Sequence, residues 1–227
     1  MKKFKGLMLA GVVAAVVAFM APTDAKALTF DLGSVFNGNT PTSTPPWLTA
    51  TFADVTPGTV TLTLTSKLNI TSEFISDVAF NVNPSFLPSS LNIVQSPIVN
   101  PIPTSISHTT DNAQNLIGGG AAGFGFDIMI SWATANNSGR FDDSDVVAFI
   151  ITATNLTAAD FDFTNTGSAQ AKIGAHIQGI PIIGDGTTSG AIKDGGGTPV
   201  PEPATMFLLG LGLIGIAGYG RKTFLKK

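Results

Sequence analysis

The sequence contains no cysteine among its 227 residues. Disulfide bridges, thiolate metal sites and cysteine nucleophiles are therefore excluded. Only 12% of the residues are charged and 8% are aromatic, whereas 44% are apolar. This composition is too apolar for a disordered chain and supplies enough residues for a core. We expect a folded body that is stabilised by packing or by bound ions.

Positive charge is scarce in the middle of the chain. Residues 28–200 hold four Lys or Arg side chains against thirteen Asp or Glu side chains, a net charge of −9, although the whole chain carries only −3. Both ends, residues 1–27 and 201–227, are basic. Because nucleic-acid binding depends on Lys and Arg side chains that neutralise phosphates, the acidic middle predicts no nucleic-acid partner.

Neither end carries an apolar run as long as the roughly 20 residues of an ordinary transmembrane helix. At the N-terminus a basic start precedes an apolar run over residues 7–21, and Ala25 and Ala27 follow with one residue between them. This order is typical of a secretory signal peptide, whereas a permanent anchor needs a longer run. We predict a signal peptide over residues 1–27, cleaved after Ala27, and export through the general secretion machinery.

The C-terminus combines a short proline-containing sequence, an apolar stretch and a basic cluster. Val200, Pro201, Glu202 and Pro203 come first, and the two prolines keep the backbone extended and accessible because they cannot join a helix or a sheet interior. Residues 204–219 follow as a predicted transmembrane helix of about 24 Å, short against a hydrocarbon core of about 30 Å. The chain closes with basic residues that would stay in the cytoplasm, namely Arg221, Lys222, Lys226 and Lys227.

This C-terminal arrangement resembles the PEP-CTERM sorting signal of exported proteins of Gram-negative bacteria. The resemblance implies that residues 200–203 are the sorting motif recognised by exosortase, a membrane protease or transpeptidase. It implies that residues 204–219 hold the chain in the inner membrane before processing, and that the basic cluster acts as the stop. It also implies delivery to the cell surface or the extracellular matrix, often together with the exopolysaccharide of a biofilm.

Between the two ends, apolar and polar residues alternate with a period of two. Over residues 58–66, Val60, Leu62 and Leu64 fall on one side and threonines on the other, which is typical of a half-buried strand. The stretch 146–153 is apolar on both sides, as expected of a central strand that is covered on both faces. Further strands are predicted at residues 47–55, 77–83, 123–133 and 171–180.

Turn-forming residues separate these short strands, and no long helical pattern lies between them. We therefore predict an all-β fold, with an antiparallel β-sandwich over residues 28–180 and a short helix over residues 156–161. Residues 181–199 are rich in glycine and proline and are predicted to be a linker to the sorting signal over residues 200–227.

Three carboxylates precede the predicted central strand: Asp142, Asp143 and Asp145. Carboxylate oxygens are calcium ligands, so these residues are candidates for a Ca²⁺ site. The loop lacks the ligand spacing and closing glutamate of an EF-hand. The alternative is a solvated acidic turn in which Asp142 or Asp145 accepts hydrogen bonds from backbone amides.

The sequence predicts no catalytic residue. Only two histidines are present, His108 and His176, and they lie far apart in the chain. Neither a Gly-x-Ser-x-Gly elbow nor a His-Glu-x-x-His metal helix occurs. Trp47 and Trp132 are too few to suggest an aromatic platform for sugars.

The sequence thus predicts an exported, non-enzymatic structural protein of the cell surface or extracellular matrix. The alternative is a calcium-dependent, lectin-like carbohydrate-binding module that uses the loop over residues 142–145. A hydrolase that uses His176 ranks third.

Overall fold

A computed structural model describes residues 26–108, 125–135, 139–164, 170–182, 186–195 and 198–199. These residues belong to one compact unit that spans residues 26–200. Ala25, the sorting motif, the apolar stretch 204–219 and the basic end lie outside the described residues. No helix within the described ranges has the length and hydropathy that crossing a membrane requires.

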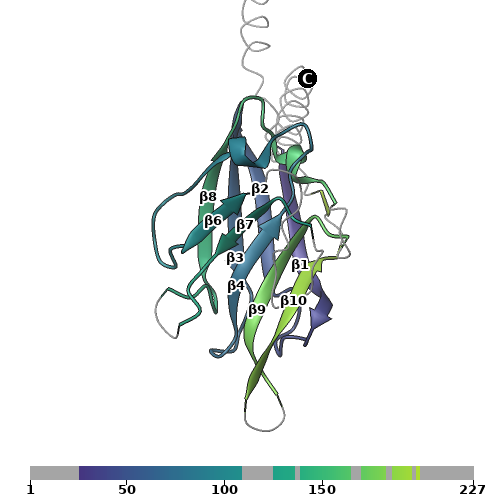
Figure 1. The fold of residues 1–227 in the computed structure, drawn as a ribbon, viewed down its shortest axis with the longest axis vertical. Helices are drawn as coiled ribbons and strands as arrows, with labels where there is room; N and C mark the ends of the chain where they lie inside the picture. Colours follow the sequence, from purple (N-terminus) through teal and green to yellow (C-terminus); the bar gives the residue numbers. More distant parts are fainter. Residues whose placement is uncertain are drawn as a thin grey trace, which may run out of the picture. The chain divides into compact units, whose positions relative to one another are not determined.

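The described residues form strands and two short 3-10 helices, labelled in Figure 1 where space allows. The N-terminal half contributes β1 (Ala27–Gly38), β2 (Leu48–Thr56), β3 (Thr59–Ser66), β4 (Phe74–Phe80), η1 (Pro88–Ser90), β5 (Asn92–Gln95) and β6 (Ser105–His108). The C-terminal half contributes β7 (Ile128–Ser131), β8 (Val146–Thr152), η2 (Ala158–Phe161), β9 (Ile173–Pro181), β10 (Thr187–Asp194) and β11 (Thr198–Pro199).

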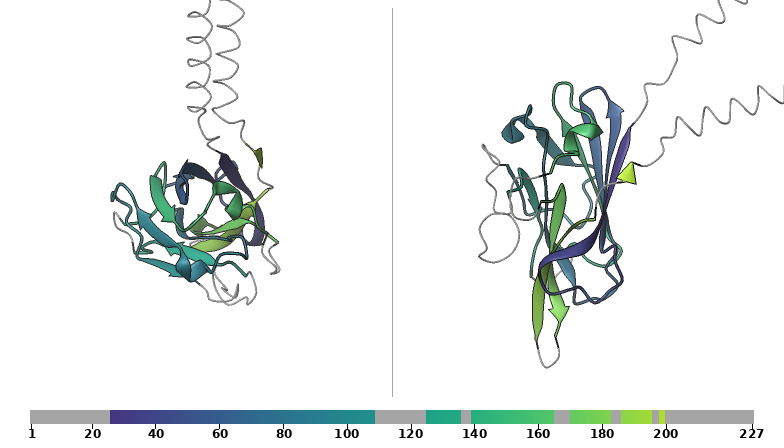
Figure 2. Two further views of the ribbon diagram at one scale, coloured as in Figure 1. Left: turned by 90° about the horizontal axis from the view of Figure 1, so that it is seen from above. Right: turned by 90° about the vertical axis from the view of Figure 1, so that its right-hand side faces the viewer.

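Ten of these strands form one continuous antiparallel sheet in the order β5-β8-β3-β2-β1-β10-β9-β4-β7-β6, and β11 pairs with β1. The sheet curls until it is nearly closed and barrel-like, as the two views in Figure 2 show. The predicted all-β, antiparallel fold is confirmed, but the predicted sandwich of two separate sheets is wrong. Alternation shows which face of a strand is buried, whereas it does not show whether the strands hydrogen-bond into one sheet or two.

The core fills the inside of the curled sheet. Val60, Leu62 and Leu64 of β3 are fully buried, and the alternate threonines of the same strand are partly exposed. The strand therefore has the half-buried pattern that the period of two predicts. Trp47 and Trp132 are also buried, so neither offers an exposed ring.

An aromatic cluster occupies the centre of the core. Phe52 of β2 stacks on Phe161 with ring centroids 4.3 Å apart, and it meets Phe30 and Phe80 edge-on at 6.1 and 5.5 Å. Phe161 comes from η2, which lies within the short helix predicted over residues 156–161. Such aromatic pairs contribute about 0.5–1.5 kcal/mol beyond the burial of their area.

Two predictions for individual segments are corrected by the sheet. β8 is covered on one side only, because Val146 and Ile150 are 52% and 37% exposed on its outer face. The predicted linker over residues 181–199 contains β10, which hydrogen-bonds to β1 on one side and to β9 on the other. The one glycine within β10, Gly190, leaves room for the carbonyl oxygen of Asn39, which lies 1.9 Å from where a Cβ would be.

The two ends of the curled sheet are β5 and β6, with four residues each. They follow one another in the chain and are joined by residues 96–104, which include Pro97, Pro101 and Pro103. The Gln95 side-chain amide donates hydrogen bonds to the carbonyl oxygens of Val99 and Pro101, at 2.8 and 3.1 Å. This short, proline-rich connection is therefore tied to the end of β5.

Candidate functional site

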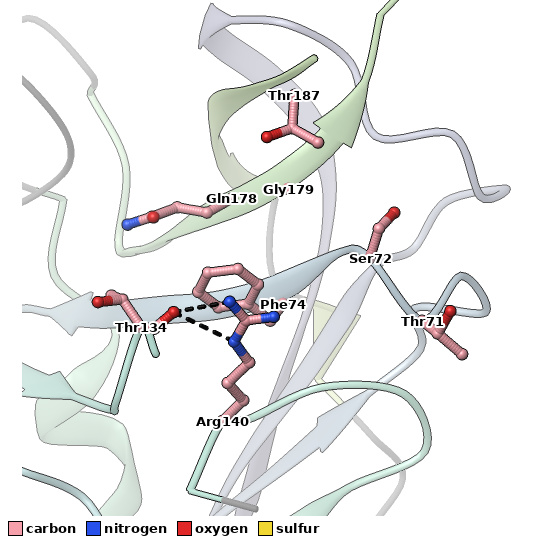
Figure 3. A pocket seen from close by; sticks show the side chains of 8 residues that line it. All are labelled: Thr71, Ser72, Phe74, Thr134, Arg140, Gln178, Gly179 and Thr187. Atoms are coloured by element: carbon pink, nitrogen blue, oxygen red, sulfur yellow. Dashed lines mark hydrogen bonds between the residues drawn. The ribbon is translucent and has the colours of Figure 1, made fainter. Parts of the chain in front are cut away.

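A pocket of about 520 Å³ opens beside the start of β4 (Figure 3). The residues before and at the start of β4 form one side, β9 and β10 form another, and the segment between β7 and β8 forms the third. The lining is mostly polar, with one aromatic ring and one cation: Thr71, Ser72, Phe74, Thr134, Arg140, Gln178, Gly179 and Thr187.

Arg140 is positioned in this pocket by a contact with an aromatic ring and by hydrogen bonds to a backbone carbonyl. Its guanidinium carbon lies 3.9 Å from the centroid of the Phe74 ring. Its Nε and one Nη donate hydrogen bonds to the carbonyl oxygen of Thr134, at 3.2 and 2.7 Å (Figure 3). A cation over an aromatic ring contributes about 0.5–1 kcal/mol at an exposed site. The pocket therefore holds a positioned positive charge in a body whose net charge is negative.

Glycine is required on the β9 side of the pocket. Gly179 has a φ of +74°, and a Cβ at this position would lie 1.9 Å from the carbonyl oxygen of Ser72. Only glycine adopts this conformation readily and permits so close an approach of two backbones. The shape of the pocket thus depends on Gly179.

The described lining residues of the pocket supply groups that can bind a ligand. Threonine, serine and glutamine side chains supply hydrogen-bond donors and acceptors, and Arg140 supplies positive charge. The lining residues that the structure describes include no carboxylate and no imidazole. They therefore offer no general base for a nucleophile or a water molecule.

The predicted calcium residues lie next to Arg140, in the turn that leads into β8. The backbone amide of Asp142 donates a hydrogen bond to Asp145 Oδ2 at 3.0 Å, and the hydroxyl of Ser144 donates to Asp143 Oδ1 at 2.9 Å. Burial and the nearby charge of Asp145 raise the pKa of Asp142. Among the residues with described placement, no three acidic or histidine side chains are grouped so as to hold a metal ion. Calcium binding by this turn stays a prediction.

His176 belongs to a polar cluster on β4, β7 and β9. The hydroxyl of Ser76 donates a hydrogen bond to Asp77 Oδ2 at 2.7 Å and lies 2.9 Å from Nδ1 of His176. The hydroxyl of Ser131 donates to Asp77 Oδ1, also at 2.7 Å. Ser76 and His176 are 2% and 8% exposed. The sequence pattern singles out only His176 of this cluster. Ser76, Asp77 and Ser131 come close to His176 through the register of β4 against β7 and β9, which the sequence does not reveal.

This cluster does not have the geometry of a catalytic triad. In a triad the serine and the carboxylate use different ring nitrogens of the histidine. Here Ser76 and Asp77 both lie near Nδ1, Asp77 Oδ2 at 3.6 Å. The serine and the carboxylate therefore share one side of the imidazole ring, and the Ser76 hydroxyl has Asp77 Oδ2 as a second partner at 2.7 Å. The arrangement is that of a hydrogen-bonded structural cluster.

The cluster stabilises the charged form of Asp77. Burial alone would raise the pKa of Asp77, but the His176 side chain, whose Nδ1 lies 3.6 Å from Asp77 Oδ2, and hydrogen bonds from Ser76 and Ser131 hold it below its ordinary value. A carboxylate whose pKa is lower in the folded state contributes stability above its unfolded pKa. That contribution is lost as the pH falls through the folded pKa.

We expect Asp77→Asn to lower the free energy of unfolding by roughly 1.5–3 kcal/mol at neutral pH, the usual contribution of a hydrogen bond to a charged group. The difference from the unchanged protein should be full at neutral pH, should begin to shrink as the pH falls through the ordinary pKa of an aspartate, and should vanish once the pH is below the lowered pKa of Asp77. Urea unfolding across this pH range measures it. Asp162→Asn is the control, because its carboxylate is exposed in a surface ion pair with Lys172 and should matter little. Equal losses in both variants at every pH would contradict the assigned role of Asp77.

The sorting residues lie outside the described part of the structure, and comparison with known families identifies them. Residues 199–222 match the PEP-CTERM protein-sorting motif, in agreement with the resemblance seen in the sequence. The matched range includes Val200, Pro201, Glu202 and Pro203. The motif implies that exosortase sorts this chain and that the protein is exported or displayed at the cell surface. No curated protein and no solved structure matches the chain.

Proposed function

We propose that this protein is a non-enzymatic structural component of an exopolysaccharide-containing extracellular matrix or cell surface. The observation that carries the proposal is the sorting motif at residues 199–222, which follows a compact all-β unit over residues 26–200. Once released from the sorting signal, such a unit is a rigid, negatively charged body outside the cell. Its role would then be to fill space in the matrix and to hold matrix components together.

The polar groups of the body support a role without catalysis. Ser76, Asp77 and His176 bond to one another, and Ser76 and His176 are only 2% and 8% exposed, so a substrate does not reach them from the surface. The described lining of the pocket contains no acid or imidazole. Enzymes need a base or nucleophile placed where a substrate can reach it.

The second candidate is a lectin-like carbohydrate-binding module. The pocket favours it, because hydroxyl and amide side chains surround a positioned Arg140 and the acidic turn over residues 142–145 lies immediately beyond. A backbone pairing between Ile75 and Phe141 fixes the start of this turn beside β4. In this candidate Asp142, Asp143 and Asp145 would take up Ca²⁺ when a saccharide binds.

Deleting the gene in the native host tests the structural role. We expect the mutant to make the same amount of matrix polysaccharide but to lose cohesion, so that gentle washing removes more of the matrix from the cells. The wild-type gene should restore cohesion, and the protein should fractionate with the matrix. Purified protein should release no reducing ends from the isolated polysaccharide. Protein found only in the medium with an unchanged matrix, or depolymerisation of the polysaccharide, would overturn the proposal.

A further inference from the structure

The outer side of β1, β2 and β3 carries a regular set of threonines. We call it the threonine face, and it consists of Thr29 on β1, Thr49 and Thr51 on β2, and Thr59, Thr61, Thr63 and Thr65 on β3. All of these residues are partly exposed, whereas the residues between them point into the core. Along these strands the threonines therefore alternate with the buried residues of the core.

The strand register aligns these threonines in rows across the sheet. Thr29 pairs with Thr51, and Thr51 pairs with Thr63. Thr49 likewise pairs with Thr65. Residues two apart on a strand are about 6.6 Å apart, and neighbouring strands are about 4.8 Å apart. Hydroxyl and methyl groups therefore repeat on a two-dimensional grid.

The hydroxyl groups are held in place before any partner arrives. Threonine is branched at Cβ and has little rotamer freedom on a strand. Thr29 Oγ1 and Thr51 Oγ1 are hydrogen-bonded to each other at 3.0 Å, and Thr49 donates to Asp31 at 2.8 Å. A surface that is ordered in advance loses less conformational entropy on binding.

The threonine face borders the outer side of β8, which is uncharged and partly apolar. Beside β3, the outward residues of β8 include Val146 and Ile150, and Ile150 pairs with the exposed Val94 of β5. Neither β3 nor β8 contains a charged residue. Of the described elements, β3 makes extensive contacts only with its sheet neighbours β2 and β8, so none of these elements forms a layer over it.

The net charge of the body indicates which kind of partner the threonine face can bind. An anionic polymer would be repelled by a body whose residues 28–200 carry a net charge of −9, and a second copy of the chain would bring the same charge. An uncharged partner with repeating hydroxyls and C–H faces can match the hydroxyl and methyl groups of the threonine grid. A neutral polysaccharide has this chemistry.

We propose that the threonine face binds neutral polysaccharide chains lying flat across β1, β2 and β3. The inference rests on the proposed matrix function and names the polymer class that the body contacts there. Many weak contacts repeated along a chain give useful avidity even where each one is weak. The pocket beside β4 is a separate feature and is not needed for this interaction.

Co-sedimentation of the protein, as the host exports it, with microcrystalline cellulose and chitin tests the proposal. The test variant is the triple substitution Thr51→Val, Thr61→Val and Thr63→Val, which removes hydroxyls and keeps the branched shape. We expect its apparent affinity to fall on the order of tenfold. The matched control is Thr44→Val, which removes an exposed hydroxyl away from the sheet and should bind normally. Circular dichroism and unfolding curves would show that all proteins are folded.

Binding should persist in EDTA and in added salt, and alginate, an anionic polymer, should not be bound. Unchanged binding by the triple variant, binding to alginate alone, or no binding to either neutral polymer would overturn the proposal. Loss of binding in EDTA, or in Arg140→Ala with the threonine face intact, would assign the binding to the pocket and acidic turn instead. None of these outcomes bears on matrix cohesion, so failure of the threonine face and failure of the matrix role are distinguishable.

Discussion

Removal of residues 201–227 is expected to convert the protein into one that is exported but neither processed nor retained at the cell envelope. The deletion removes nearly the whole sorting motif and leaves the compact unit over residues 26–200. No described strand extends beyond Pro199, so the core and the sheet lose none of their described parts. Folding should therefore be unchanged while localisation changes almost completely.

Cell fractionation with an epitope inserted in the body measures this effect, and intact mass spectrometry of the exported protein identifies both termini. Replacing Pro201, Glu202 and Pro203 together by alanine is the companion variant, because it leaves residues 204–227 in place. We expect that variant to keep its C-terminus and to stay with the membrane fraction. Unchanged retention of the deletion variant would show that the sorting motif does not hold the protein at the envelope.

Phe52→Ala is expected to cause a large loss of stability, because it empties the centre of the aromatic cluster. The Phe52 side chain is fully buried and contacts the rings of Phe30, Phe80 and Phe161. Truncating a buried phenylalanine removes its burial and leaves a cavity, at a cost of about 3–5 kcal/mol. For a domain of this size, that loss corresponds to a fall in Tm of roughly 6–20 °C.

Urea and thermal unfolding of the exported protein measure the change. Phe52→Leu should lose much less, because it keeps most of the apolar volume. Phe86→Ala is the positional control, since Phe86 is only partly buried where it packs against the core. A loss below about 1 kcal/mol for Phe52→Ala would mean that the cluster is not the centre of the core.

The sequence predicts best where a strand has one apolar and one polar face. In β3 the alternation identifies the buried residues Val60, Leu62 and Leu64 correctly, because the period of two is a direct consequence of strand geometry. In β8 the same reasoning predicts a covering layer that none of the described residues forms, since the outer face of the strand is also apolar. Val146 and Ile150 are exposed, so sequence pattern alone does not distinguish a buried face from an apolar surface.

Features that depend on pairing between distant segments are not predictable from the sequence. The glycine-rich composition around β10 favours a flexible linker in the sequence, yet in the fold Gly190 of β10 permits close contact with the backbone of Asn39. The cluster of Ser76, Asp77, Ser131 and His176 depends on three strands that are far apart in the chain. The sorting motif is predictable because its residues are contiguous and their function does not depend on the fold.

The four-residue strands at the two ends of the sheet affect how the protein behaves when it is crowded. A long, flat sheet edge offers unpaired amides and carbonyls to which another chain can add, and this is how fibrils grow. β5 and β6 offer only short edges, and the prolines that join them supply no amide donors. Molecules packed at high concentration outside the cell should therefore remain separate units instead of polymerising through their strands.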